Sequence, residues 1–269
     1  MLLAMDIGNT VVTMGVFDDA ELITTLRVAT DTRRLADEYG VMVTNSLVLK
    51  GVSPKDITAV CLCSVVPPLT VVFTEVCDTL FNADPLIVSA GVRTGLPILY
   101  DNPRDVGADR IADAVAAIDL YGSPLIVVDL GTATVFDAIS RKGEYLGGAI
   151  APGINLAADS LFFNTSQLRR VELIAPETAI GHSTITALQS GLVLGYTGLI
   201  STMVQRFKDE VGSDAKVIGT GGLINVISQQ ESIFDEINRD LTLLGLRFIY
   251  NLNQGDNKPG KRNERTTYK

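Results

Sequence analysis

The sequence predicts an α/β protein made of two copies of one domain. Two observations predict this duplication. A short motif occurs at 5–11 and again at 128–134, and in both places an apolar strand ends in an aspartate, an apolar residue, a glycine and a small polar residue. The β-rich runs that follow the two motifs also match each other. Because matching motifs with matching flanks indicate an internal repeat, we expect two domains of the same fold.

Each motif opens a predicted meander of three strands. After the first motif the β-rich runs cover 11–17 and 22–28, and after the second they cover 134–139 and 145–150. A short polar turn separates the runs of each pair, which is typical of antiparallel hairpins. Both halves are therefore expected to begin in the same way.

The rest of the first half alternates helices and strands. Apolar residues at helical spacing predict a helix at 37–49, and 69–81 reads as a second one. The unbroken apolar run at 59–66 predicts a strand buried on both faces, and 85–88 predicts a shorter strand. A meander followed by such α and β units is typical of a ribonuclease-H-like domain.

The next segment is predicted to be a helix that starts at Asn102-Pro103, since asparagine is a good cap and proline suits a first helical turn. Asp109 and Asp113 share one face of this helix by their spacing. The simplest interpretation is structural. Asp105 and Asp109 would compensate the helix dipole, and Arg110 would pair with one of them.

The second half is predicted to end its meander in a sharply shaped loop at 147–153, which holds three glycines and a proline. The remaining elements are expected, in chain order, as a helix at 155–163, a helix at 185–211 capped by Ser183 or Thr184, a strand at 216–218 and a helix at 239–252. Glycines in the long helix favour close packing, including packing against another subunit.

The duplication sets the expected domain boundaries. Residues 1–118 form the N-terminal ribonuclease-H-like domain, and residues 119–252 form the C-terminal one. The polar, basic residues 253–269 are expected to be a disordered tail. A nucleotide cleft is expected between the two domains.

The composition is that of an acidic protein with a large core. Hydrophobic residues make up 46% of the chain, and the net charge of −9 argues against non-specific binding to nucleic acid. No uninterrupted apolar run reaches the length of a signal peptide core or a membrane span. The three cysteines have no metal-ligand partners in the sequence and are interpreted as buried thiols. We expect a cytoplasmic protein with no nucleic-acid or membrane partner.

The two aspartate–glycine turns indicate a polyphosphate site. A glycine lets backbone N–H groups approach phosphate oxygens, and a carboxylate can hold the cation that neutralises them. Either turn alone is common turn chemistry, so the pairing carries the inference. The sequence has no phosphate-binding P-loop, no Gly-x-Ser-x-Gly and no metal-ligand cluster. His182 is the only histidine and is interpreted as structural, so acid–base catalysis must use carboxylates.

Seven segments carry a resemblance to a known family: Asp6–Thr10, Tyr100–Pro103, Gly107–Arg110, Asp129–Thr134, Gly147–Gly153, Thr220–Gly222 and Leu241–Leu246. With them the chain resembles type III pantothenate kinase over about residues 1–252. That family belongs to the superfamily of acetate and sugar kinases, heat-shock chaperones and actin. Gly-Ala-Asp-Arg together with Gly-Gly-x-Ile-x-Pro-Gly is specific to the family. The resemblance implies two actin-like ATPase domains around one nucleotide cleft.

The resemblance also implies an activity: ATP-dependent phosphorylation of pantothenate to 4'-phosphopantothenate, the first step of coenzyme A biosynthesis. It implies Asp109 as the catalytic base, Asp6 in the Mg²⁺ environment, Asp129 as the site of a monovalent cation (K⁺ or NH₄⁺), and a homodimer. The implied ATP-binding residues are Asp6, Ile7, Gly8, Asn9, Thr10, Val11, Val12, Thr13 and Thr132. The implied substrate-binding residues are Tyr100, Gly107, Ala108, Asp109, Arg110 and Thr184.

The residue types also fit this chemistry independently of the resemblance. Phosphoryl transfer needs alignment and charge neutralisation more than covalent help. A carboxylate beside a primary hydroxyl can accept its proton, and Arg110 could clamp the substrate carboxylate through two donors. Three alternatives share the fold: a non-enzymatic regulator that binds nucleotide or pantothenate, an actin-like filament protein, and a different small-molecule kinase. The presence of Asp109 disfavours the first, and the short chain disfavours the second.

Overall fold

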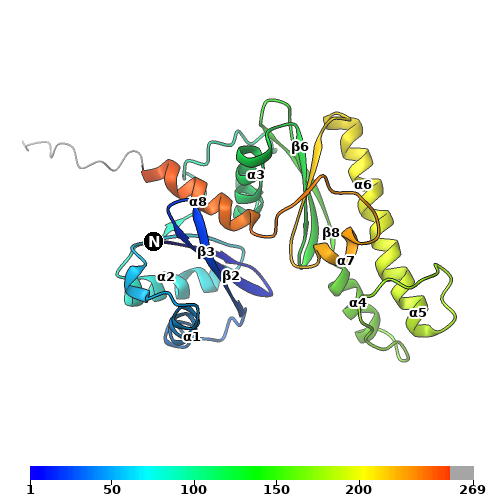
Figure 1. The fold of residues 1–269 in the computed structure, drawn as a ribbon, viewed down its shortest axis with the longest axis horizontal. Helices are drawn as coiled ribbons and strands as arrows, with labels where there is room; N and C mark the ends of the chain where they lie inside the picture. Colours follow the sequence, from blue (N-terminus) through cyan, green and yellow to red (C-terminus); the bar gives the residue numbers. More distant parts are fainter. Residues whose placement is uncertain (255–269) are drawn as a thin grey trace, which may run out of the picture.

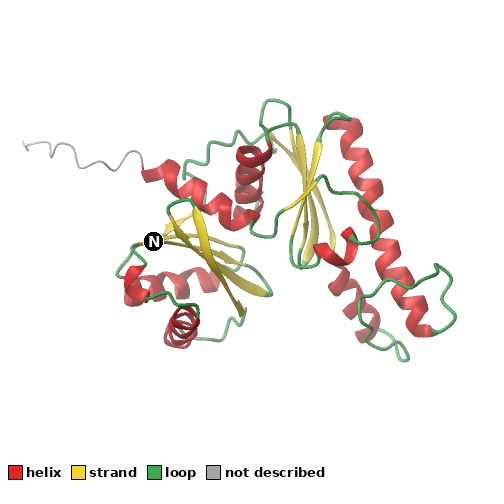
Figure 2. Cartoon of the chain, in the orientation of Figure 1, coloured by secondary structure: helices red, strands yellow, loops and turns green. Residues whose placement is uncertain are grey.

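The computed structural model describes residues 1–254, and these residues form two five-stranded sheets with helices around them (Figures 1 and 2). The strand order is β3-β2-β1-β4-β5 in the first sheet and β8-β7-β6-β9-β10 in the second. In both sheets the first three strands form an antiparallel meander, and the last two pair in parallel. The predicted duplicated α/β fold is confirmed.

The first sheet consists of β1 (Leu2–Ile7), β2 (Val11–Asp18), β3 (Glu21–Ala29), β4 (Ala59–Ser64) and β5 (Leu86–Ile87). Helices α1 (Ala36–Leu49) and α2 (Pro67–Phe81) cover one of its faces. The buried side chains Tyr39, Leu47, Leu69 and Phe73 join these helices to the sheet in one apolar cluster. Burial of such a face provides most of the stability of the half.

The second sheet consists of β6 (Leu125–Leu130), β7 (Ala133–Ile139), β8 (Tyr145–Pro152), β9 (Lys216–Thr220) and β10 (Glu236–Ile237). Its outer face is covered by α4 (Ile154–Phe163), α6 (Gly195–Val211) and the short α7 (Ile224–Ser228). Helix α5 (Thr184–Gln189) precedes α6 and lies beyond the end of this sheet (Figure 1).

Two helices fill the space between the sheets, α3 (Ala108–Tyr121) and α8 (Leu241–Gln254), as Figure 1 shows. Helix α3 packs mainly on the second sheet and α8 mainly on the first, and each helix also contributes side chains to the other cluster. The two helices cross closely, because Gly245 of α8 lies directly against the backbone carbonyl of Ala112 in α3. Thr242 of α8 also donates a hydrogen bond to Asp113 of α3 at 2.7 Å. The last helix of the described chain therefore holds the two halves together.

Three local predictions were wrong in detail. Asn102 caps a separate 3-10 turn at Pro103–Asp105, and α3 begins only after Gly107. The segment predicted as a loop at 147–153 belongs mostly to strand β8, although close backbone approach, which was also predicted there, does occur at Gly148. The long helix expected at 185–211 is interrupted by a π turn at Ser190–Leu194.

Other predictions are confirmed. Ser183 caps α5 through a hydrogen bond from the backbone N–H of Thr186, and all three cysteines are buried free thiols. The expected tail at 253–269 lies outside the described residues from position 255 onward, and residues 253–254 are the last of α8.

The helical segment Thr184–Val211 is, by length and composition alone, apolar enough to cross a membrane. No such segment was predicted, because polar residues interrupt the apolar run within this helix. A core helix passes the same test, and here Leu192, Val193 and Ile200 pack on the second sheet. The opposite face is open: outside the helix's own neighbouring backbone, a side chain added at Gly191, Gly195 or Gly198 would meet no atom of residues 1–254 within 4 Å.

Candidate active site

The two predicted turns meet in the folded chain. Thr10 of the first turn and Thr132 of the second share a hydrogen bond between their hydroxyl oxygens at 2.8 Å. The glycine N–H closes each turn, donating to the carbonyl of Val11 from Gly8 and to the carbonyl of Ala133 from Gly131. The expectation that two glycine turns would face each other is confirmed for these residues.

Further backbone contacts hold the two turns. In the first sheet, the Thr30 hydroxyl donates to the carbonyl of Gly8 at 2.7 Å. In the second, Gly221 has a φ of 92° and lies against the Asp129 carboxylate and the backbone of Leu130, where a side chain would not fit. The Thr220–Gly222 turn therefore closes over Asp129, and glycine is required there for both backbone angle and space.

Four carboxylates gather where the two turns approach α3. Burial and then the charge of Asp109 raise the pKa of Asp6 to about 7. Burial and then the charges of Asp6 and Asp109 raise the pKa of Asp129 to about 7. Burial followed by the charge of Asp129 raises the pKa of Asp113 well above its usual value. Because each negative charge disfavours the others, a cation bound here would be stabilised by relief of this repulsion.

Asp109 lies in the first turn of α3. Its Oδ1 accepts the backbone N–H of Arg110 at 2.9 Å, so the carboxylate also compensates the helix N-terminus, as the structural interpretation expected. That bond involves only one carboxylate oxygen. Asp109 contributes to the pKa shifts of both Asp6 and Asp129, which places it near both turns.

Arg110 forms a buried ion pair with Asp137, so the predicted pairing with Asp105 or Asp109 was wrong. Its Nε and Nη2 donate to Oδ1 of Asp137 at 3.0 and 2.6 Å, and the Tyr145 hydroxyl donates to the same oxygen at 2.7 Å. Arg110 is 9% exposed, Asp137 2% and Tyr145 0%. Asp137 was missed because it was read only as part of strand 134–139. A carboxylate inside an otherwise apolar strand was the available signal.

Two glycines of β8 make room for this ion pair and for Tyr100. A side chain at Gly148 would collide with the Phe136 carbonyl and approach Arg110 and Asp137, which explains the glycine there. At Gly147 the backbone has a φ of 130°, and the Tyr100 ring lies 3.4 Å from the position of an added Cβ. Tyr100, Arg110 and these glycines therefore form one wall next to Asp109.

Thr184 is not part of this wall. It begins α5 and is exposed, and Figure 1 shows α5 at the far end of the molecule from α3. His182 is exposed beside it. Within one chain, the structure therefore does not bring Thr184 together with Tyr100, Gly107, Ala108, Asp109 and Arg110.

Among the described residues, no group of three or more His, Cys, Asp or Glu side chains is arranged to hold a metal ion unaided. The carboxylates of the two turns could still bind a hard cation if other ligands completed its coordination. Magnesium is commonly held by one or two carboxylates together with phosphate oxygens and water, and Asp6 and Asp129 provide carboxylates of raised pKa at the two phosphate-type turns. A divalent ion at these two carboxylates would need phosphate oxygens and water as its remaining ligands.

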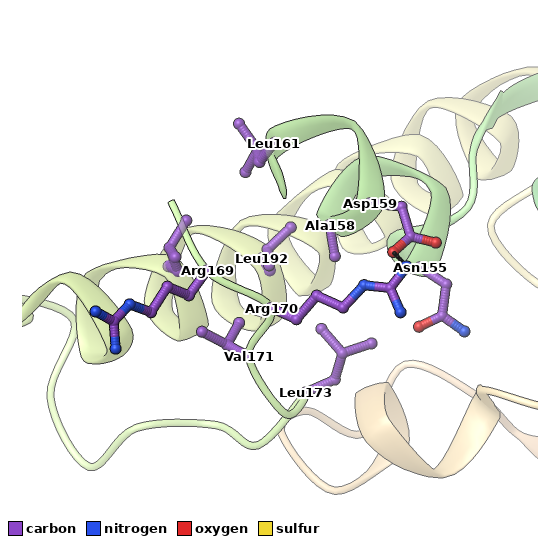
Figure 3. Close-up of a pocket in the computed structure, with 10 residues that line it drawn as sticks. Asn155, Ala158, Asp159, Leu161, Arg169, Arg170, Val171, Leu173 and Leu192 are labelled. Atoms are coloured by element: carbon purple, nitrogen blue, oxygen red, sulfur yellow. Dashed lines mark ion pairs between the residues drawn. The ribbon is translucent and has the colours of Figure 1, made fainter. Parts of the chain in front are cut away.

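A separate pocket of about 200 Å³ lies between α4, the segment 169–173 and the end of α5 (Figure 3). Arg170 pairs with Asp159 at 3.3 Å across its rim, and its guanidinium lies over the Phe162 and Phe163 rings. The lining includes no residue of the two turns or of α3. This pocket is therefore distinct from the acidic site.

Comparison with known proteins identifies the family. The model of the family described as type III pantothenate kinase matches residues 2–206. A curated relative of that name from Dehalococcoides mccartyi is 47% identical over 253 residues, covering 94% of this chain and 96% of its own. The chain belongs to the type III pantothenate kinase family.

Further comparisons agree with this membership. The relative from Myxococcus xanthus, also named type III pantothenate kinase, is 46% identical over 94% of this chain and 99% of its own. Among solved structures, an activator of 2-hydroxyisocaproyl-CoA dehydratase from Clostridium difficile with bound ADPNP has a TM-score of 0.57, 12% identity, and coverage of 98% of this chain and 99% of its own. That likeness shows a shared fold only. The region that carries the type III pantothenate kinase likeness includes both turns and all of α3.

Proposed function

We propose that the protein transfers the γ-phosphate of ATP to pantothenate, giving 4'-phosphopantothenate, the first step of coenzyme A biosynthesis. The observation that carries the proposal is the 47% identity to a type III pantothenate kinase along nearly the whole chain. The joined turns at Thr10 and Thr132, with Asp109 nearby, support it independently. Since cellular ATP is its substrate and its cysteines are reduced thiols, we place the enzyme in the cytoplasm.

The first turn is proposed to hold the phosphates of ATP. Residues 6–13 run from the end of β1 into β2, and Thr132 faces them from the second sheet. Backbone N–H groups at such turns bind phosphate oxygens without needing a lysine. Asp6 would hold Mg²⁺ together with those phosphates, where the ion offsets their negative charge.

Asp129 is proposed to hold a monovalent cation, K⁺ or NH₄⁺. It ends β6 beneath the Thr220–Gly222 turn, surrounded by backbone as well as by acids. Burial and then the charges of Asp6 and Asp109 raise the pKa of this carboxylate, and a bound monovalent cation would offset part of that penalty. Asp6 and Asp129 therefore have different roles despite their symmetric positions.

Asp109 is proposed as the general base, with Tyr100, Gly107, Ala108 and Arg110 binding pantothenate around it. A base at the helix start can take the proton of the substrate hydroxyl as the new O–P bond forms. The tight backbone at Gly107, where a side chain would collide with the Asp109 carboxylate, supports a fixed geometry for the base.

The test is a coupled assay of ADP release with pantothenate in K⁺ and in Na⁺ buffers. We expect ADP release to require pantothenate and to rise with K⁺. Asp129→Asn should lose the response to K⁺, whereas Asp6→Asn should raise the KM for Mg-ATP and keep that response. No ADP release with pantothenate would refute the function. Equal wild-type rates in the two buffers would refute the monovalent site.

We also propose a homodimer. Thr184 can contact substrate only if a second copy of the chain provides it, because within one chain it lies far from Asp109. The second half also exposes apolar side chains, with Ile150, Leu156 and Phe163 each more than half exposed and the glycines at the start of α6 uncovered. Such a surface suits an isologous interface.

Light scattering should give twice the 28.8 kDa mass of one chain. Asp109→Asn and Thr184→Val should each have low activity at limiting pantothenate. When the two are mixed and allowed to exchange, half of the dimers carry one intact site, so activity should approach about a quarter of wild type. A monomeric mass, or a mixture no more active than its two components, would contradict the shared site.

A further inference from the structure

The ion pair of Arg110 with Asp137 has a defined geometry. Both donors, Nε and Nη2, point to one carboxylate oxygen, and the Tyr145 hydroxyl donates to that oxygen as well. Three hydrogen bonds to a single buried oxygen fix the guanidinium in one orientation. The Nη1 nitrogen takes no part in the pair.

Three elements are joined by this network. Arg110 comes from α3, Asp137 from β7 and Tyr145 from β8. The Arg110 guanidinium also lies 5.8 Å from the centre of the Tyr145 ring, and the Tyr145 ring lies 6.3 Å from that of Tyr100. The glycine at 148 is required for the pair to fit. A residue adjacent to the proposed base is therefore held by the second sheet rather than by its own helix.

The pair also determines what charge the site presents. A guanidinium bonded at 2.6 Å to a buried carboxylate forms a nearly neutral unit. Moving Asp137 away to free Arg110 would leave two buried charges unpaired, which is strongly unfavourable. Arg110 is thus poorly suited to clamp the carboxylate of a substrate, although that role was expected from the sequence.

We infer that Asp137 is a positioning residue, which with Tyr145 fixes Arg110 beside Asp109 and offsets its charge, so that Arg110 binds a neutral polar group of the substrate. In pantothenate such a group is a hydroxyl or the amide, and the carboxylate lies away from Arg110. The inference rests on the proposed role of Arg110 in substrate binding, and it adds the specificity of that contact.

The test compares wild type with Tyr145→Phe, which removes one hydrogen bond to Asp137 and leaves every charge in place. Dissociation constants are measured by calorimetry for pantothenate and for pantothenol, in which an alcohol replaces the carboxylate. We expect Tyr145→Phe to weaken both ligands by the same factor, about tenfold, and to leave ATP binding within twofold. Asp137→Asn, if the variant folds, should weaken the binding of pantothenate and of pantothenol by a larger factor than Tyr145→Phe, and by the same factor for both.

Tyr39→Phe is the matched control. Tyr39 is also fully buried, and its hydroxyl bonds to the backbone of residue 31 in the first half, away from Arg110. This variant should lower the melting temperature without changing pantothenate binding. If Tyr145→Phe behaves like Tyr39→Phe, the network is only structural and the inference is wrong.

Two other outcomes would overturn the inference. A loss seen with pantothenate but not with pantothenol would show that Arg110 meets the carboxylate. If wild type did not bind pantothenol at all, the substrate carboxylate would be essential for binding. Arg110, the cationic side chain beside Asp109, would then be its partner. The proposed function is tested separately by the activity of wild type. If wild type phosphorylates pantothenate, the proposed function stands, whatever the result for Tyr145→Phe.

Discussion

Asp109→Asn should lower kcat by about 10²–10⁴-fold and leave the fold intact. The amide oxygen of asparagine can still accept the Arg110 N–H that Asp109 accepts at 2.9 Å, so the start of α3 is preserved. What is lost is the proton acceptor. The variant also removes one negative charge from the acidic site, which should lower the pKa of Asp6 and of Asp129.

The control for Asp109→Asn is Asp105→Asn. Asp105 is an exposed acid in the 3-10 turn just before α3, and its carboxylate accepts a hydrogen bond from the Asn102 amide. Its loss should leave kcat within threefold of wild type. Steady-state kinetics with saturating ATP and pantothenate measure both variants, and circular dichroism checks their fold. Equal kcat values for Asp109→Asn and wild type would remove Asp109 from the chemistry.

Gly245→Ala should lower the free energy of unfolding by about 3 kcal/mol, because the new methyl group would collide with the Ala112 carbonyl at the crossing of α8 and α3. Neither backbone can retreat easily, since α8 packs on the first sheet and α3 on the second. For a protein of this size the melting temperature should fall by about 6–12 °C.

Gly40→Ala is the matched control within a helix. Gly40 is buried in α1, but an added Cβ would meet only the Leu80 side chain at 3.8–3.9 Å, an ordinary contact. Alanine favours helix by up to about 1 kcal/mol over glycine, so Gly40→Ala should stabilise the protein. Urea unfolding of both variants gives the comparison. Similar stabilities for Gly245→Ala and wild type would show that the helix crossing is looser than described.

The duplicated fold could be predicted because its signals are local. Each meander is encoded by β-rich runs and a polar turn within about 25 residues, and the two aspartate–glycine motifs lie at the same place in each copy. The meeting of Thr10 and Thr132 followed from that symmetry.

The parts that could not be predicted depend on contacts between distant segments. Glycines at 147 and 148 indicated a loop, yet they serve a strand that must pass close to Phe136, Arg110 and Tyr100. The role of Asp137 depends on its ion pair with Arg110, which lies 27 residues earlier in the chain. The capping residue Asn102 was recognised, but whether it would start α3 or a separate turn depended on packing that the segment alone does not encode.

The placement of α8 has a consequence for how the chain is made. The face of the first sheet that carries Leu2, Ala4 and Phe17 is covered by residues of α8, which leave the ribosome more than 220 residues later. During synthesis, one apolar side of the earliest strands thus stays bare while the whole second half is translated. Transiently exposed apolar strands favour aggregation, so the nascent chain is most at risk before residues 241–254 are made and cover this face.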